Sequence, residues 1–279
     1  MSVSVPSVPV HPAREEDLPP EAGDLLHALA TDPEGVVVAR DEVRGVVLGL
    51  AAVVARGDVL SLVHLDVTRA ARGKGVGVAL FSAVRAYGAS RGTRRLAFAR
   101  EADDATLGFL LGEGLPVRGL ALRLRARSFP PGDAAIPLSP LVAGAPLSGW
   151  VAALDRETRG FSRTADWSWW MRHGTEAFAA RRGGRPEGVG AMRLDGRQAF
   201  LGPVEADTPA AAAALLIALA AEARRRGASE ILITLPAEAR LLLTEALRAG
   251  FRLAGTFPIL AGPAPGDLRR YAASPTAFF

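Results

Sequence analysis

The sequence lacks several residue types on which whole classes of protein function depend. It has no cysteine among its 279 residues, which excludes disulfide bonds, zinc–thiolate sites and a thiol nucleophile. It also has no asparagine, and Lys74 is its single lysine, so nearly all basic side chains are arginine. Because arginine keeps its charge to very high pH, the sequence pI is near 10.4 although the net charge is only +4.

Long apolar runs and continuous basic stripes are missing as well. The alanine-rich stretch near residue 210 is flanked by charges and predicts a packed helix, not a membrane span. The segment Met1–Val5 has no basic residues leading into an apolar core, so it does not resemble a secretory signal. Acidic residues interleave with the scattered arginines, which argues against a nucleic-acid surface. We therefore expect a cytoplasmic protein without nucleic-acid or membrane partners.

The order of predicted elements is similar in the two halves of the chain. Hydrophobic residues make up 49% of the sequence, so 279 residues can build two domains with separate cores. After a short apolar run and a helix beginning near Arg14, the first half predicts strands at 36–39, 45–54 and 59–67, a helix at 78–87, a strand at 95–99, a helix at 105–111 and a strand at 120–126. The second half predicts helices at 150–155 and 167–171, strands at 177–181, 188–194 and 198–204, a helix at 209–225, a strand at 231–235, a helix at 237–249 and a last strand from Phe251.

A proline-rich segment separates the halves. Residues 128–146 hold five prolines and predict a linker. We therefore expect an N-terminal domain at 1–127 and a C-terminal domain at 147–279. Similar element order with little residue identity suggests a duplication.

A glycine-rich basic loop follows the strand predicted at 59–67. Gly73, Gly75 and Gly77 alternate directly before a predicted helix, with Arg72 and Lys74 among them. Glycines let a backbone approach a phosphate closely, and the free N–H groups of a helix N-terminus attract anions. The loop lacks the Gly-Lys-Ser/Thr ending of a Walker A motif and the GxGxxG spacing of a dinucleotide-binding motif. A glycine-rich turn without a ligand stays an alternative.

This segment resembles the signature of the GNAT superfamily of acyl-CoA N-acyltransferases. Arg72–Gly77 fits the pattern Arg/Gln-x-x-Gly-x-Gly/Ala, and Val67 occupies the usual valine before the loop. The resemblance covers residues 5–126 well and the second half more weakly, because Ala206–Ala210 has neither glycine nor a basic residue at the equivalent place. It implies an α/β fold of the α+β kind, with two tandem GNAT-like domains, each a mixed, mostly antiparallel sheet flanked by helices, the second one degenerate.

The resemblance also implies a function. It predicts an N-acetyltransferase that moves an acetyl group from acetyl-CoA, as co-substrate and without a metal, to a primary amine on a small molecule or a peptide amino terminus. The chain would act as a monomer or homodimer. The implied CoA-binding residues are Leu65, Val67, Arg72, Gly73, Lys74, Gly75, Val76 and Gly77. Loop amides would hold the pyrophosphate, and the strand at Leu65 and Val67 would pair with the pantetheine arm.

The usual acid and base of such enzymes are not at their usual places. Leu110 stands where the family often has a tyrosine, and Phe98 where it often has a glutamate. His64, Asp66 and Glu101 are the local candidates for catalysis, although each could equally be an ordinary structural residue. Positioning with water as proton carrier is another possibility. These departures leave a rival hypothesis, a non-catalytic acyl-CoA-binding or regulatory module.

Two further features have open interpretations. The cluster Trp167, Trp169, Trp170 and His173 could line an acceptor pocket, but core packing is the more common fate of tryptophan. The apolar end Ala277–Phe279 could present its terminal carboxylate to a site.

Overall fold

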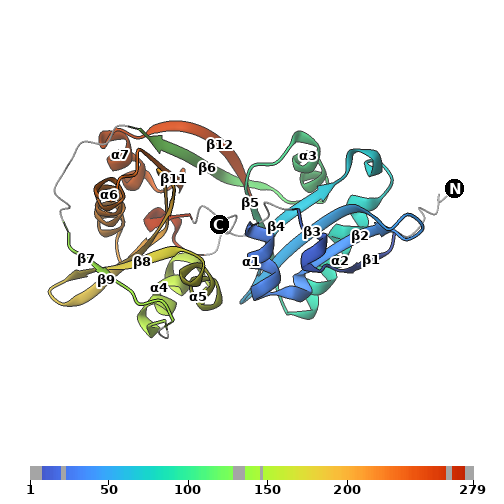
Figure 1. Cartoon of the computed structure of the whole chain (residues 1–279), viewed down its shortest axis with the longest axis horizontal. Helices are drawn as coiled ribbons and strands as arrows, with labels where there is room; N and C mark the ends of the chain where they lie inside the picture. The colour runs from blue at the N-terminus through green and yellow to red at the C-terminus, as the bar shows by residue number, and fades with distance from the viewer. Residues whose placement is uncertain (1–7, 20–22, 128–135, 145–146, 262–265, 274–279) are drawn as a thin grey trace. The chain divides into compact units, whose positions relative to one another are not determined.

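The computed structural model describes residues 8–19, 23–127, 136–144, 147–261 and 266–273 (Figure 1). Contacts divide the chain into two compact units. The first contains the described parts of Met1–Phe98, Ala102–Pro116 and Ala261. The second contains Ala99–Glu101 and the described parts of Val117–Leu260 and of 266–273. Each unit is described by itself, with the strands that belong to it.

The sheet of the first unit runs in the order β1–β2–β3–β4–β5. Its strands are β1 (Val10–Pro12), β2 (Val36–Asp41), β3 (Val46–Arg56), β4 (Val59–Val67) and β5 (Arg95–Ala99). Neighbours are antiparallel except β4 and β5, which are parallel. The helices are α1 (Gly23–Thr31), α2 (Val76–Ser90) and α3 (Asp104–Gly112). Glu15–Asp17, expected to open a helix, forms a separate 3-10 turn before α1.

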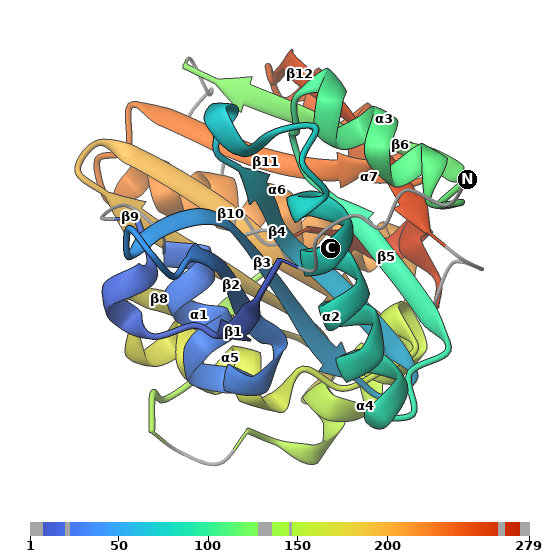
Figure 2. The same cartoon turned by 90° about the vertical axis from the view of Figure 1, so that its right-hand side faces the viewer.

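Helix α2 lies against β2, β3 and β4 (Figure 2). Its Leu80, Phe81 and Val84 are buried in the contact. Gly49 of β3 permits this close approach, because a Cβ atom there would lie 2.7 Å from the carbonyl oxygen of Asp66 and 3.0 Å from Leu80 Cδ1. The core of the first unit thus fixes the position at which α2 begins, directly after the glycine-rich loop.

The second unit has the sheet order β12–β6–β11–β10–β9–β8–β7, with β13 paired to β10. Its strands are β6 (Val117–Ala126), β7 (Leu138–Pro140), β8 (Thr175–Arg182), β9 (Arg185–Asp195), β10 (Gln198–Ala206), β11 (Glu230–Pro236), β12 (Arg252–Ala261) and β13 (Tyr271–Ala272). Its helices are α4 (Gly149–Arg159), α5 (Thr164–Arg172), α6 (Pro209–Arg225), α7 (Arg240–Arg248) and the 3-10 helix η4 (Leu268–Arg270). Helices α6 and α7 pack against each other (Figure 1).

Strand β6 was expected in the first domain but belongs to the second unit. The sequence order places it last in the first domain, but it pairs antiparallel with β11 and β12 of the second unit. Its Leu124 and Ala126 are buried in the same apolar cluster as α6. Along the chain, the second unit therefore takes over after Pro116 and not after the expected residue 127, because the apolar face of β6 packs in the core of the second unit.

The expected linker is only partly a linker. Residues 128–135 and 145–146 lie outside the described residues. Between them, Leu138–Pro140 forms β7, which pairs antiparallel with β8. An edge strand tolerates proline because one side of it needs no hydrogen-bond donor. The proline content of this stretch therefore did not exclude a strand.

The tryptophan cluster divides between core and surface. Trp167 and Trp170 are buried and meet edge to face, with ring centroids 5.6 Å apart. Trp169 stacks on the exposed His173 at 4.0 Å, and His173 Nδ1 lies 2.7 Å from the Trp169 carbonyl oxygen. Core packing thus accounts for two of these side chains.

Candidate functional site

A pocket of about 360 Å³ lies at the carboxyl end of β4. Mostly apolar residues from β4, the glycine-rich loop, α2 and α3 form its wall: Leu65, Val67, Ala71, Arg72, Gly73, Gly75, Val76, Gly77, Val78, Ala105, Thr106 and Phe109. Its volume is in the range of small-ligand sites. All of these residues belong to the first unit.

The pocket is open beside β4 because β5 pairs only with the first part of that strand. The parallel register joins Val59 to Arg95, Leu60 to Leu96 and Ser61 to Ala97. Farther along β4, Leu65 and Val67 line the pocket instead. Their backbone can pair with an extended ligand in the way that a strand edge pairs with an added strand.

The N-terminus of α2 forms one end of this pocket. Gly75 is its N-cap residue, with φ +81°, and no side chain caps the helix there. Glycine adopts this left-handed conformation without the steric cost that a Cβ atom brings. The first turn of α2 carries no acidic residue, so its backbone N–H groups and the helix dipole favour an anion.

Two basic side chains belong to the loop, in different surroundings. Lys74 is exposed and does not line the pocket. Arg72 lines it, and its Nε donates to the Val67 carbonyl oxygen at 3.1 Å. Arg72 Nη2 also lies 3.0 Å from Asp103 Oδ2 and 3.8 Å from Asp66 Oδ1. Arg72 thus connects β4 to the start of α3, and an incoming anion would compete with two carboxylates for it.

Asp103 is the N-cap of α3. Its Oδ1 accepts from the Thr106 backbone N–H at 2.9 Å. Hydrogen bonds from Thr106 hold the pKa of the Asp103 carboxyl below its usual range, and the Arg72 guanidinium adds to this effect. Thr106 and Phe109 of the same helix line the pocket, and Phe109 meets Phe81 of α2 edge to face with centroids 5.5 Å apart. Asp103 therefore helps to place the α3 wall.

We expect Asp103→Ala to lower the free energy of unfolding by about 1 kcal/mol, because α3 loses its N-cap acceptor. Asp103→Ser is the matched control, since its hydroxyl can still cap the helix without the charge that faces Arg72. Urea denaturation of the two variants separates these roles. Equal losses in both variants would assign the stabilisation to the ion pair and not to the cap.

The structure brings together most of the predicted CoA-binding residues. Leu65, Val67, Arg72, Gly73, Gly75, Val76 and Gly77 all line the pocket, whereas Lys74 does not. Sequence reasoning missed Ala71, Val78, Ala105, Thr106 and Phe109. The three residues on α3 have helical spacing that places them on one face, and this was the available signal. The binding roles themselves stay predictions.

None of the predicted catalytic residues is among those that line the pocket. His64 is half-buried on β4 opposite Ala52 of β3, and Asp66 is exposed beside Arg72. Glu101 groups with the second unit, where its Oε1 accepts from Arg123 Nη1 at 2.8 Å. Leu110 and Phe98, at the usual acid and base places, are buried. The apolar end Ala277–Phe279 lies outside the described residues. The catalytic roles of His64, Asp66 and Glu101 stay predictions.

Among the described residues, no group of three or more His, Cys, Asp or Glu side chains is placed to hold a metal ion. In the same part of the chain, no helix is both long and apolar enough to cross a membrane.

Comparison with family models gives a match in each half of the chain. Residues 7–112 match a model described as the acetyltransferase (GNAT) family, and residues 151–263 match one described as an acetyltransferase (GNAT) domain. The two matches cover most of both units. No curated protein matches the sequence.

Solved structures share the fold over most or all of the chain. A putative acetyltransferase from Pyrococcus horikoshii is 16% identical with a TM-score of 0.79, and the match covers 100% of this chain and 98% of that one. A GCN5-related N-acetyltransferase from Anabaena variabilis is 12% identical, with a TM-score of 0.64 and coverage of 91% and 72%. A tandem GNAT protein from the clavulanic acid biosynthesis pathway is 15% identical, with a TM-score of 0.57 and coverage of 86% of both chains. At these identities the similarity is one of fold.

Proposed function

This chain belongs to the GNAT acetyltransferase family and carries two of its domains, and from this premise we propose that it transfers an acetyl group from acetyl-CoA to a primary amine. The acceptor would be a small-molecule amine or a peptide amino terminus, and the enzyme a cytoplasmic monomer or homodimer. The observation that supports the proposal best is the pocket at the end of β4, where an uncapped helix N-terminus, a glycine loop and an apolar strand edge meet.

The residues of the pocket fit an acyl-CoA. The amides at the start of α2 would hold the pyrophosphate, with Lys74 as a nearby cation. The β4 backbone at Leu65 and Val67 would pair with the pantetheine arm, and Phe109 would cover it from α3. No covalent attachment to the chain is required by this arrangement.

Acetyl transfer would then proceed by direct attack. The neutral amine nitrogen adds to the thioester carbonyl carbon, the C–S bond breaks, and the nitrogen loses a proton while the thiolate gains one. The chain needs to supply orientation, a donor for the oxyanion, and routes for these two protons. With Leu110 and Phe98 at the usual acid and base places, the protons must move through other side chains or water.

The replacement of both usual groups favours a second function, a non-catalytic acyl-CoA-binding module. The two functions differ in turnover. We expect the purified chain to bind CoA and to release CoA thiol when acetyl-CoA is incubated with a panel of small amines and amino-terminal peptides. Tight CoA binding without thiol release by any acceptor would favour the binding module, and no binding at all would reject both functions.

A substitution of His64, a candidate base, can separate an effect on catalysis from an effect on CoA binding. We expect His64→Ala to lower kcat by about 10²-fold, because a positioned base typically contributes at least this factor. CoA affinity should hold, since His64 does not line the pocket. Glu245→Gln is the comparison variant and should leave kcat nearly unchanged, because Glu245 pairs with Arg248 and is not a candidate catalytic residue. An unchanged kcat in His64→Ala would remove this side chain from the mechanism.

A further inference from the structure

The two units have equivalent strands at the place where the first unit forms its pocket. Strands β4 and β10 each precede a helix and each pair in parallel with the following strand, β5 or β11. The parallel pairing of β10 ends at Leu201 opposite Ile233, as that of β4 ends at Ser61 opposite Ala97. In both units, therefore, the second half of the strand is left without its parallel neighbour.

In the second unit another strand takes that neighbour's place. Strand β13 pairs antiparallel with β10, Val204 opposite Ala272 and Glu205 opposite Tyr271. The next residue, Ala273, forms a bridge to Thr234 of β11, with its N–H 2.9 Å from the Thr234 carbonyl oxygen. The chain's own C-terminal segment thus has backbone contacts to both strands and lies in the gap between them.

The residues of β10 that pair with β13 can be matched to positions in β4. Counted from the first residue of each strand, Val204 of β10 corresponds to Leu65 of β4 and Ala206 to Val67. Leu65 and Val67 line the pocket of the first unit. Strand β13 therefore pairs with β10 at the stretch that, in β4, is open to a ligand.

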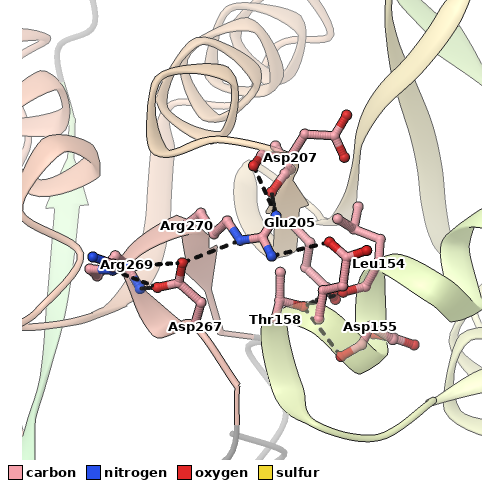
Figure 3. A network of polar contacts seen from close by, with 10 residues as sticks. Leu154, Asp155, Thr158, Glu205, Asp207, Asp267, Arg269 and Arg270 are labelled. Carbon is pink, nitrogen blue, oxygen red and sulfur yellow. Dashed lines mark hydrogen bonds and ion pairs between the residues drawn. The ribbon is translucent and has the colours of Figure 1, made fainter.

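The turn before β13 also contacts the elements that surround the equivalent place in the second unit. Helix η4 packs against α6 and α7, the counterparts of α2 and α3. Arg270 of η4 donates from Nη1 to the carbonyl oxygens of Ala206 and Asp207, at 3.0 and 2.9 Å (Figure 3). It also pairs with Glu157 and Asp267. A guanidinium and its carboxylates thus lie at the strand end, where the first unit has its glycine loop.

Buried contacts hold this segment in place. Tyr271, Ala272 and Ala273 are buried, and Ala272 belongs to the main apolar cluster of the second unit. The Tyr271 hydroxyl accepts from Arg163 Nη1 at 2.9 Å, and the Arg159 guanidinium lies 4.6 Å from the centre of its ring. Such a segment is part of the core, and displacing it would expose core side chains and buried charges.

We propose that Leu268–Ala273 is the built-in occupant of the cofactor cleft in the second unit, with β13 lying where a pantetheine arm would pair. The second unit is then permanently closed to acyl-CoA, and each chain has one acyl-CoA site, in the first unit. This inference rests on the proposed function for the position of the pantetheine arm along β4. Its physical basis is competition: the same backbone N–H and C=O groups of β10 cannot pair with β13 and with a ligand.

The absence of cysteine allows a direct test with an engineered disulfide. Val204→Cys with Ala272→Cys places two thiols on directly opposed residues of β10 and β13, within disulfide range. Ala177→Cys with Ala191→Cys is the matched control, since these opposed residues of β8 and β9 are equally buried in the same unit but do not involve β13. Each full-length variant is studied oxidised and reduced, by mass spectrometry, CoA calorimetry and thiol-release assay.

We expect the disulfide between β10 and β13 to form in the folded protein. The oxidised and reduced forms should each bind one CoA, with dissociation constants and kcat/KM values that agree within about a factor of two. In the unmodified chain, the Ala273 amide should exchange with D₂O only when the second unit unfolds. CoA should change its protection by no more than that of other core amides of this unit.

Several results would overturn the proposal. These are failure of the disulfide to form while the control disulfide forms, lower CoA stoichiometry or activity on oxidation of the test pair alone, or binding of a second CoA by the reduced form. Rapid exchange of the Ala273 amide would do the same. If no form binds CoA, the proposed function fails, but disulfide formation and amide exchange still decide whether β13 occupies the cleft.

Discussion

Replacing Gly75 with aspartate is expected to weaken CoA binding about a thousandfold or more. Gly75 is the N-cap of α2, with φ +81°, and lines the pocket. A carboxylate there would lie within a few ångströms of the proposed pyrophosphate. Two unit charges 4 Å apart repel each other by about 4 kcal/mol at the effective dielectric constant of a protein surface, which corresponds to about three powers of ten in affinity.

Gly75→Asn is the matched control for this variant. Asparagine has nearly the same shape as aspartate, and both tolerate a left-handed backbone better than other residues with a side chain. The asparagine variant should therefore lose much less affinity than the aspartate variant. Calorimetry with CoA and with pantetheine separates the effects further, because pantetheine has no pyrophosphate and should bind both variants alike. Equal losses of CoA affinity in the two variants would mean that shape, and not charge, controls this position.

Removal of Arg163 is expected to destabilise the second unit by about 3–5 kcal/mol, the usual cost of leaving buried charges without their partner. The Arg163 side chain is buried and donates to Asp155 Oδ1 from Nε and Nη2, at 2.9 and 2.7 Å. It also forms an ion pair with the buried Glu205, which accepts from Thr158. Arg163→Met would leave two carboxylates in the core without their cation.

Urea denaturation of Arg163→Met and of a control variant tests this expectation. Arg248→Met is the control, because its ion pair with Glu245 lies at the surface and such pairs contribute at most about 1 kcal/mol. Adding Asp155→Asn and Glu205→Gln to Arg163→Met should recover part of the loss, since neutral side chains cost less to bury. A loss in Arg163→Met no greater than in the control would show that water or another cation reaches the two carboxylates.

Several parts of the fold could be predicted from the sequence because local patterns determine them. The bounds predicted for β4 from its β-branched residues and the flanking turn residues, Val59–Val67, are those of the structure. Thr208 followed by Pro209 correctly predicted where α6 begins. The glycine loop fixed the start of α2 to within two residues, because the alternation of Gly73, Gly75 and Gly77 is a local requirement of the backbone. The family could be recognised for the same reason, since its signature is one short contiguous segment.

Only the tertiary structure decided which strands pair across long distances in the chain. The apolar face of β6 could complete a sheet in either unit, and nothing in its own residues specifies β11 and β12 as partners. The proline content of Leu138–Pro140 predicted a linker, yet β8 provides the backbone partners that make it an edge strand.

The same distinction applies to the ends of β4 and β10. The sequence by itself determined that the first unit has a phosphate-type loop and that the second, with Pro209 and alanines after it, does not. It could not determine that Tyr271–Ala272 lies between β10 and β11, because a short strand near the chain end has no periodic pattern to reveal its partners. That placement depends on the buried contacts of Tyr271 with Arg163 and Arg159, and these form only when residues about a hundred positions apart in the chain are packed together.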